Sequence, residues 1–444
     1  MKPAHRQYYA AFCANLATVL YGIFISWSSP YIPLLQSENS PLKNRLSDEE
    51  ASWIAAIGGF GGLASTFLCG WLLDRIGRKK TLILIGIPQI ICWVLILYGT
   101  TANQLLVARI LGGLSGGGAF TVVPVFVSEI ADDDRRGNLG TIFSVSCNFG
   151  IFLGFVITTF FEYHFVPKIV LAMALMYSVN IMFVKESPNF HKLRGNYAQA
   201  EESNKYYTGN KVQEFVKESN NNFVKEKLRL SDFKNPAYWK PTIMSLIVTT
   251  FCTVSGSFVI ICFTKQILDE AGSPFSSEMG SIIIAFIQFL GSYVASLVIE
   301  RLGRKLLLLT SAIVATISLS IAGSYYYLKS LEQISPSYSA TPLVCVSVLF
   351  FIVAAGLATV PIVVVTEILP HKIRGLIFTL CMAELWTIII LGVRYFMAMS
   401  DAMGMHGFLW FFAGTSFVAA AFIGLCLPET KGKSIDTIAG FFNK

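Results

Sequence analysis

The stretches WLLDRIGRKK, residues 71–80, and VIERLGRKLL, residues 298–307, decide the fold of this 444-residue chain. Each places an acid, an arginine, a glycine and a basic pair at the same offsets, between two long apolar runs. A glycine lets the chain reverse sharply between two helices, and charged side chains remain where the chain leaves an apolar phase. One such phrase in each half predicts an internally repeated helical membrane protein.

The composition excludes a soluble protein of this length. Hydrophobic residues make up 54% of the chain and charged residues only 14%, whereas a soluble surface needs more charge. Many apolar runs are long enough to cross about 30 Å of hydrocarbon. The alternating pattern of an outer-membrane barrel is absent, so the spans should be helices. We expect twelve of them, at 9–30, 51–73, 81–101, 105–128, 138–160, 167–184, 241–263, 279–299, 306–328, 341–366, 375–396 and 407–427.

A polar stretch separates the first six spans from the last six. It contains two helix-compatible pieces, 196–208 and 211–229, so we expect short cytoplasmic helices under the bundle instead of a plain solvated linker. The fold class is therefore an all-α membrane protein with twelve transmembrane helices in two six-helix halves. The expected divisions are an N-terminal half at 1–184, a cytoplasmic linker at 185–240, a C-terminal half at 241–427 and a cytoplasmic tail at 428–444.

The distribution of lysine and arginine predicts which side each loop faces. With both termini inside, the cytoplasmic segments hold 27 of the 34 basic residues, and the outer segments hold five. Basic residues concentrate in cytoplasmic loops, so we expect both termini in the cytoplasm of a plasma-membrane protein. The net charge of +7 is then a signature of membrane insertion, and we expect no nucleic-acid partner.

The outer segment 36–50 carries a signal for the start of a helix. Ser47 is followed three residues later by Glu50, a spacing at which each side chain caps the other residue's backbone N–H. We therefore expect a helix to begin just after Ser47.

No group of residues indicates catalysis, a cofactor or a metal. All nine cysteines lie in apolar spans, and no cysteine–histidine set has metal-binding spacing. The five histidines are scattered without a nucleophile–base pair, so we do not expect an enzyme. The glycine runs at 58–62 and 112–118 lack the lysine and the strand-to-helix context of a phosphate loop, and they predict close helix packing.

Several motifs follow one another in a fixed order along the chain. They are DRIGRKK (74–80), ARILGGLSGGG and VPVFVSEI (108–130), RRGNLG (135–140), KESPNF (185–190), ERLGRK (300–305), TEILPHKIRG (366–375) and LPETKGKS (427–434). With this ordered set the chain resembles the sugar porter family of the major facilitator superfamily over nearly its whole length. Three further stretches, WSSPYIPLL, EEASWIAAIG and VSGSFVIICFT, resemble the branch of insect facilitated trehalose transporters.

The resemblance implies a cytoplasmic charge network that closes the outward-facing state. Arginine can bind a carboxylate through two parallel hydrogen bonds. Two positions depart from the family pattern, because Asn189 replaces its arginine and Lys185 replaces a proline. The network members that the resemblance implies are Asp74, Arg78, Glu129, Arg136 and Glu186 in the first half, and Glu300, Arg304, Glu367, Arg374 and Glu429 in the second.

The substrate path implied by the resemblance has few of the side chains that bind sugar in hexose-carrying relatives. Where hexose-carrying relatives place amides or an indole, this chain has Phe258, Ile362 and Leu385, whereas Gln288 and Trp386 match the family. The alternative role for the small polar candidates is hydrogen bonding between helices. The candidates for the path are Ser144, Asn148, Ser255, Ser257, Gln288, Glu384 and Trp386.

Glu384 lies about ten residues from either end of its expected span. A carboxylate at that depth is costly and should face a cavity or a partner. One interpretation is a group that contacts the solute or a proton. The other is a neutral glutamic acid bonded to a neighbouring helix. Arg394 is too far along the helix to pair with it.

The function implied by the resemblance is transport of a small polyhydroxy solute, a sugar such as trehalose or glucose, by a monomer in the lipid bilayer. Relatives coupled to protons carry an aspartate in the first span, but residues 15–27 contain no carboxylate, which favours facilitated transport by alternating access. The alternatives are a proton-coupled transporter of a different solute, and a non-transporting sensor-like member, suggested by the missing sugar ligands.

Overall fold

The structure, a computed structural model, describes residues 2–209, 234–272 and 275–431, without the side chains of Asp133, Asp134, Arg136, Glu300, Pro336 and His371. Every regular element in these residues is helical, as predicted. The elements are α1 (Pro3–Ser26), α2 (Ser28–Gln36), α3 (Asp48–Ala56), α4 (Gly58–Ile76), α5 (Arg78–Tyr98), α6 (Ala102–Ile130), α7 (Asp133–Phe160), α8 (Val166–Met182), α9 (Pro188–Leu193), α10 (Tyr197–Thr208), α12 (Pro236–Thr253), α13 (Ser257–Cys262), α14 (Thr264–Ala271), α15 (Ser277–Leu302), α16 (Arg304–Ser330), the 3-10 helix η2 (Pro336–Tyr338), α17 (Thr341–Ala355), α18 (Val360–Ile368), α19 (His371–Arg394) and α20 (Phe396–Cys426).

The membrane-spanning segments agree with the predicted count. Eleven helical segments of the described chain are long and apolar enough to cross a membrane, and the shorter apolar α8 accounts for the sixth predicted span. Several spans consist of consecutive helices: α1 with α2, α3 with α4, α12 with α13, and α17 with α18. Hydropathy did not predict these breaks, because it registers apolar length and not backbone direction.

The last span begins earlier than predicted. It was expected at 407–427, whereas α20 starts at Phe396. The helix changes direction at Gly404, whose φ is 71°. Polar residues around this bend lower the local hydropathy, so the apolar pattern did not predict the first turns of α20.

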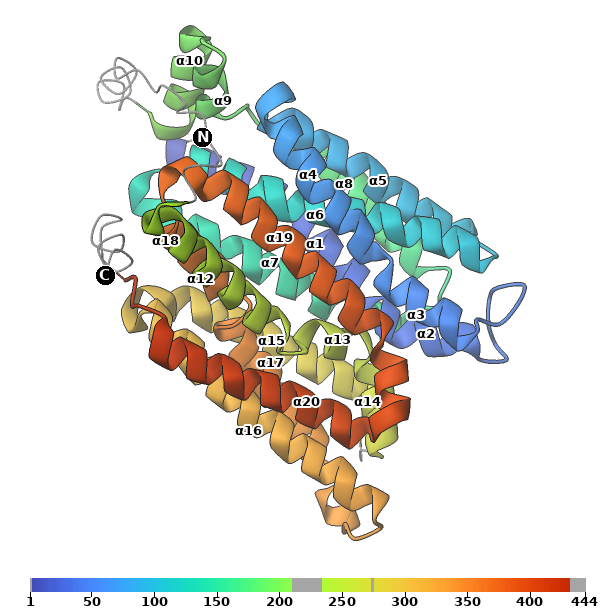
Figure 1. Ribbon diagram of the computed structural model, residues 1–444. Helices are drawn as coiled ribbons and strands as arrows, with labels where there is room; N and C mark the ends of the chain where they lie inside the picture. Colours follow the sequence, from blue (N-terminus) through green and yellow to red (C-terminus); the bar gives the residue numbers. More distant parts are fainter. Residues whose placement is uncertain (1, 210–233, 273–274, 432–444) are drawn as a thin grey trace.

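The helices form two groups, with α1–α8 in one and α12–α20 in the other (Figure 1). Within the first group α1 packs on α7 and α4 on α6, and within the second α16 packs on α20 and α15 on α17. The groups meet through α7 against α15 and through α4 against α19. Segments far apart in the sequence therefore build the central interface.

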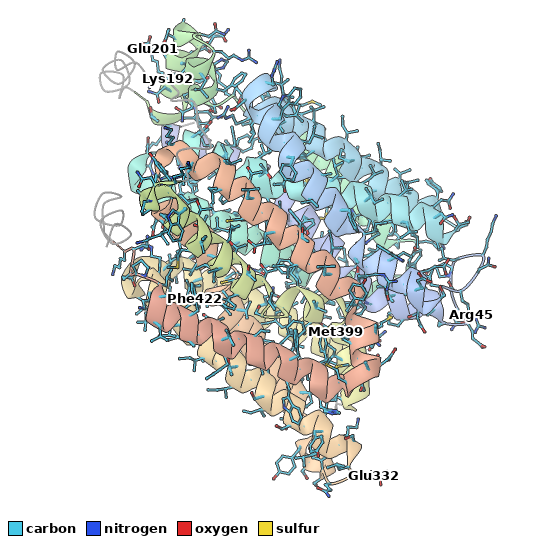
Figure 2. All side chains as sticks on the ribbon, in the orientation of Figure 1. Arg45, Lys192, Glu201, Glu332, Met399 and Phe422 are labelled. Atoms are coloured by element: carbon cyan, nitrogen blue, oxygen red, sulfur yellow. The ribbon has the colours of Figure 1, made fainter. Side chains whose placement is uncertain are left out.

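The helices of the central stretch lie at one end of the bundle, which we call the linker end. Gln7 Nε2 of α1 donates to Tyr207 O of α10 at 2.9 Å, and the Tyr207 side chain is fully buried. Lys192 and Glu201 mark this end, whereas Arg45 and Glu332 mark the opposite one, the far end (Figure 2). The predicted helix at 196–208 is present as α10, while the predicted piece at 211–229 and residues 432–444 of the tail lie outside the described residues.

The predicted helix start at Ser47 is confirmed. The Ser47 hydroxyl accepts from the Glu50 N–H at 3.2 Å, and Glu50 Oε2 accepts from the Ser47 N–H at 2.9 Å. This local signal was readable because both partners lie within one turn.

The glycine runs bring α4 and α6 into backbone contact, as predicted. A Cβ atom added at Gly113 would lie 1.8 Å from the carbonyl oxygen of Gly58, and one added at Gly117 would lie 2.4 Å from that of Gly62. Small residues of this kind let membrane helices approach closely and gain dispersion contacts.

We expect Gly113→Ala to destabilise the protein, because the new methyl group meets backbone that cannot move aside. Overpacking of this kind costs about 1–3 kcal/mol, and the thermal unfolding midpoint in detergent should fall accordingly. Gly70→Ala is the matched control: Gly70 lies in α4 with open space around it, so alanine there should be neutral or stabilising. Equal midpoints for the two variants would contradict the packing argument.

Candidate functional site

The first repeated phrase builds a charge network at the linker end of α4, α5 and α6. Arg78 Nη2 lies 2.7 Å from Glu129 Oε1, and both side chains are largely buried. The backbone N–H groups of Arg78 and Lys79 donate to the Glu186 carboxylate at 3.1 Å. Ser187 Oγ donates to Glu129. The network therefore joins the α4–α5 turn to the end of α6 and to the segment that precedes α9.

The second repeated phrase builds the same network in the other half. Arg304 Nη2 lies 3.0 Å from Glu367 Oε1. The N–H groups of Arg304 and Lys305 donate to Glu429 at 3.0 and 3.1 Å, and Thr430 Oγ1 donates to Glu367 at 2.6 Å. Each role in the first network thus has an equivalent residue in the second.

Both turns require glycine. The φ angles of Gly77 and Gly303 are 99° and 90°, a region that other residues rarely occupy. A Cβ atom would also lie 2.4 Å from Glu186 Oε2 at Gly77 and 2.8 Å from Glu429 Oε2 at Gly303. The glycine therefore serves both the reversal and the close approach of the carboxylate.

The carboxylate of Glu429 stays ionised because of its backbone donors. Burial acts to raise its pKa, but the N–H groups of Lys431, Arg304, Lys305 and Thr430 outweigh burial, and its pKa lies below the ordinary value. Several N–H bonds to a carboxylate favour its charged form.

The structure brings together six of the ten predicted network residues, three in each half. Arg374 lies elsewhere, and it donates to Leu369 O at 3.1 Å beyond the end of α18. Asp74 is exposed near the end of α4. The side chains of Arg136 and Glu300 lie outside the described residues. Both described networks stay within their own half, so closure between the halves remains a prediction.

Sequence reasoning missed the two hydroxyl groups that complete the networks. Ser187 directly follows Glu186, and Thr430 directly follows Glu429. A hydroxyl residue after the repeated glutamate was the available signal. The substitution Lys185, which replaces a family proline, pairs with Glu202 at 2.7 Å and so attaches α10.

Three predicted path residues form one chain of hydrogen bonds between the halves. Gln288 Nε2 of α15 donates to Asn148 Oδ1 of α7 at 2.8 Å, and Asn148 Nδ2 donates to Ser144 O at 3.0 Å. The hydroxyls of Ser144 and Thr359 lie 2.9 Å apart. Gln288 Oε1 is buried without a hydrogen-bond partner among the described residues, so it can accept a bond from a solute hydroxyl.

Trp386 also lies at the interface between the halves. Its Nε1 donates to Thr66 Oγ1 of α4 at 3.1 Å, and its ring centroid lies 6.0 Å from those of Tyr21 and Phe120. Gly62 makes room for the indole, because a Cβ there would lie 2.7 Å from the ring. An aromatic surface of this kind suits the apolar face of a small ligand.

The other predicted path residues do not join this group through described bonds. Ser255 Oγ donates to Cys252 O at 2.8 Å and lies 3.3 Å from Ser257 Oγ, at the break between α12 and α13. Glu384 is hydrogen-bonded to Thr250 of α12. Because Glu384 and Trp386 are two residues apart on α19, they point to nearly opposite sides of the helix.

A second set of contacts joins the halves at the far end, and we call it the outer latch. Arg394 Nη2 lies 3.7 Å from Glu49 Oε1, and its guanidinium carbon lies 4.8 Å from the centroid of Trp53. The Lys265 N–H donates to Ser29 Oγ at 2.9 Å. The described bonds between the halves thus lie in the middle and at the far end.

Arg109 of α6 is a buried cation. Its guanidinium donates to Phe24 O at 2.7 Å, to Ile54 O at 3.0 Å and to Ser28 Oγ at 2.7 Å. The guanidinium carbon Cζ of Arg109 also lies 3.8 Å from the centroid of the Phe24 ring. Carbonyl and hydroxyl oxygens at the α1–α2 and α3–α4 breaks therefore satisfy this charge.

Comparison with known proteins places the chain among transporters. A family model described as "Sugar (and other) transporter" matches residues 10–442. The facilitated trehalose transporters Tret1 of Aedes aegypti and Culex quinquefasciatus are each 28% identical over 441 residues, or 97% of this chain. The chain spans 54% of the length of the first relative and 85% of the second. The xylose transporter XylE from E. coli in its inward-open conformation has the same fold, with a TM-score of 0.82, 19% identity, and coverage of 98% of this chain and 99% of that one.

We expect Arg78→Ala to lower the thermal unfolding midpoint, because it leaves Glu129 buried without its cation. Breaking a buried pair costs about 3–5 kcal/mol, or roughly 6–20 °C for a half of this size. Arg304→Ala should have a similar effect, and the double variant should be additive, since the networks share no residue. Arg75→Ala, at an exposed position in the same turn, is the control. An Arg78→Ala midpoint equal to that of Arg75→Ala would contradict this reading.

We expect Arg394→Gln to open the far end. The substitution removes both the ion pair with Glu49 and the cation–π contact with Trp53, each worth about 0.5–1 kcal/mol near a surface. A cysteine placed at Ser52, which lies beside Met397 of the other half, should then react faster with an impermeant thiol reagent. Arg45→Gln is the matched control, because its ion pair with Glu38 lies within one half. Equal labelling rates in the two variants would rule out the latch.

Proposed function

Since the chain belongs to the sugar (and other) transporter family, we propose that this multi-pass membrane protein moves a small polyhydroxy solute, a sugar such as trehalose or glucose, across the plasma membrane by alternating access. The observation that carries the proposal is that Gln288, Asn148 and Trp386 all take part in hydrogen bonds between the two halves. Amide groups can bind sugar hydroxyls, and an indole can stack on a sugar ring.

The arrangement of bonds supports alternating access. The linker-end networks tie helices together within each half, so each half can move as a unit. Among the described residues the hydrogen bonds and ion pairs between the halves are few and separate: a polar chain at α7 and α15, the Trp386 contact, and the outer latch. Rocking of one half against the other breaks such contacts without disrupting the networks. In this proposal the linker end and both termini face the cytoplasm, and the protein acts as a monomer in the bilayer.

The surroundings of Arg109 support facilitated transport. Its charge is satisfied by carbonyl oxygens and a hydroxyl, and no carboxylate is present in residues 15–27 of the first span. The cation near the first span therefore has no acidic partner there to exchange a proton during the cycle.

We expect uptake of radiolabelled trehalose to exceed that of glucose in cells lacking sugar uptake of their own, because apolar Phe258, Ile362 and Leu385 replace sugar-binding groups of hexose carriers. Gln288→Leu should lower uptake about tenfold, the loss of one buried hydrogen bond. Gln89→Leu, at another buried glutamine within a span, is the control.

Absence of uptake of both sugars by the wild-type protein at the cell surface would contradict the proposal. That result would favour a transporter of another solute or a sensor-like protein. Equal uptake by the Gln288→Leu and Gln89→Leu variants would instead exclude Gln288 from the path.

A further inference from the structure

Glu384 is a carboxyl group deep in the membrane part of the C-terminal half. It lies ten residues before the end of α19 and faces α12 through its contact with Thr250. Its Oε2 atom is buried and has no hydrogen-bond partner among the described residues. A charged carboxylate in this setting has a single hydroxyl donor for its two oxygens.

The other carboxylates in the interior have more hydrogen-bond donors and charged partners than Glu384 has. Glu129 pairs with an arginine and accepts from a hydroxyl. Glu186 accepts backbone N–H bonds from three residues, and Glu429 accepts from four. Glu384 has neither an arginine nor a backbone donor among its described contacts. Its environment therefore does not replace the water that an ionised carboxylate loses on burial.

The helices packed against α19 supply no charged partner near its middle in the described part of the chain. These helices are α3, α4, α12, α13, α18 and α20. The sequence of α13 contains no charged residue. On α19 itself the nearest titratable side chain is Cys381, one turn earlier. The charged residues of the other packed helices lie toward the helix ends: Asp48, Glu49 and Glu50 on α3, Asp74 and Arg75 on α4, Lys240 on α12, Glu367 on α18, and Asp401 on α20. His406 lies further along α20, where its ring centroid is 5.4 Å from that of Tyr327 and 5.5 Å from that of Trp410.

The Thr250 hydroxyl group lies between two oxygen atoms that can each accept a hydrogen bond. Its hydroxyl has one hydrogen, yet its oxygen lies within hydrogen-bonding distance of two acceptors, Leu246 O at 3.0 Å and Glu384 Oε1. If Glu384 is ionised, the two acceptors compete for one proton. If Glu384 is protonated, its O–H donates to Thr250 Oγ1 and the Thr250 O–H donates to Leu246 O. The protonated form alone makes both bonds and leaves no buried charge.

We propose that Glu384 is a proton-binding site in the C-terminal half and that its proton is held in the conformation described here. The ligand is a proton bound on the carboxyl group, and Thr250 positions it. This site is separate from the interface at Gln288 and Trp386, on the other side of α19. It is also separate from the first span. Glu384 therefore gives the C-terminal half a titratable carboxyl group, whereas residues 15–27 of the first span contain none.

Infrared spectroscopy of the purified protein in lipid nanodiscs tests the site without a transport assay, so its failure is distinguishable from failure of the proposed function. At neutral pH the wild-type protein should show a C=O stretching band of a protonated carboxyl group in an apolar setting. Glu384→Gln should lose this band. The control Glu38→Gln, at an exposed side chain, should retain it. Raising the pH until the wild-type carboxyl ionises should remove the band from the wild-type protein.

A band that survives unchanged in Glu384→Gln would overturn the proposal. Thr250→Val provides a second test that keeps the carboxyl group, should Glu384→Gln fail to fold. Loss of the accepting hydroxyl should shift the band in Thr250→Val to the frequency of a carboxyl group that donates no hydrogen bond. An unshifted band in Thr250→Val would likewise overturn it.

Discussion

The fold depends on how two helix N-termini at the linker end bind carboxylates. Glu186 and Glu429 each accept the first N–H groups of a helix, α5 and α16, directly after a glycine turn. Free N–H groups and the helix dipole make this position favourable for an anion. The arginine that supplies one of those N–H groups also extends its guanidinium to a third helix. One residue thereby fixes the turn, the next helix and its neighbour, and the chain repeats this in each half.

The described hydrogen bonds and ion pairs inside the halves differ in kind from those between the halves. Inside the N-terminal half, α4 and α6 touch backbone to backbone through glycines, and the Arg78 network holds their linker ends. Between the halves the described bonds are single, such as Trp386 to Thr66 or Arg394 to Glu49. Separating the halves therefore breaks few of the described hydrogen bonds and ion pairs, whereas a rearrangement within a half breaks buried charge pairs.

Sequence reasoning succeeded where the signal was local or repeated. The Ser47 cap and the glycine packing follow from short spacings, and the apolar runs predict the number of spans. The path residues were harder: Gln288 and Trp386 do lie between the halves, but the rotation of α19 that turns Glu384 toward Thr250 depends on packing. The outer latch could not be predicted, because Glu49 and Arg394 are brought together only by the folding of both halves. Hydropathy likewise missed the helix breaks.

The buried arginines and glutamates differ in how many partners satisfy their charges. Arg78, Arg304 and Arg109 each have strong acceptors, and Glu129, Glu186 and Glu429 each have charged or multiple donors. The described bonds that satisfy these charges each lie within one half. Glu384 differs because the protein supplies only one hydroxyl to it. A proton then takes the place of the missing partner, and unlike an arginine it can leave when the surroundings change.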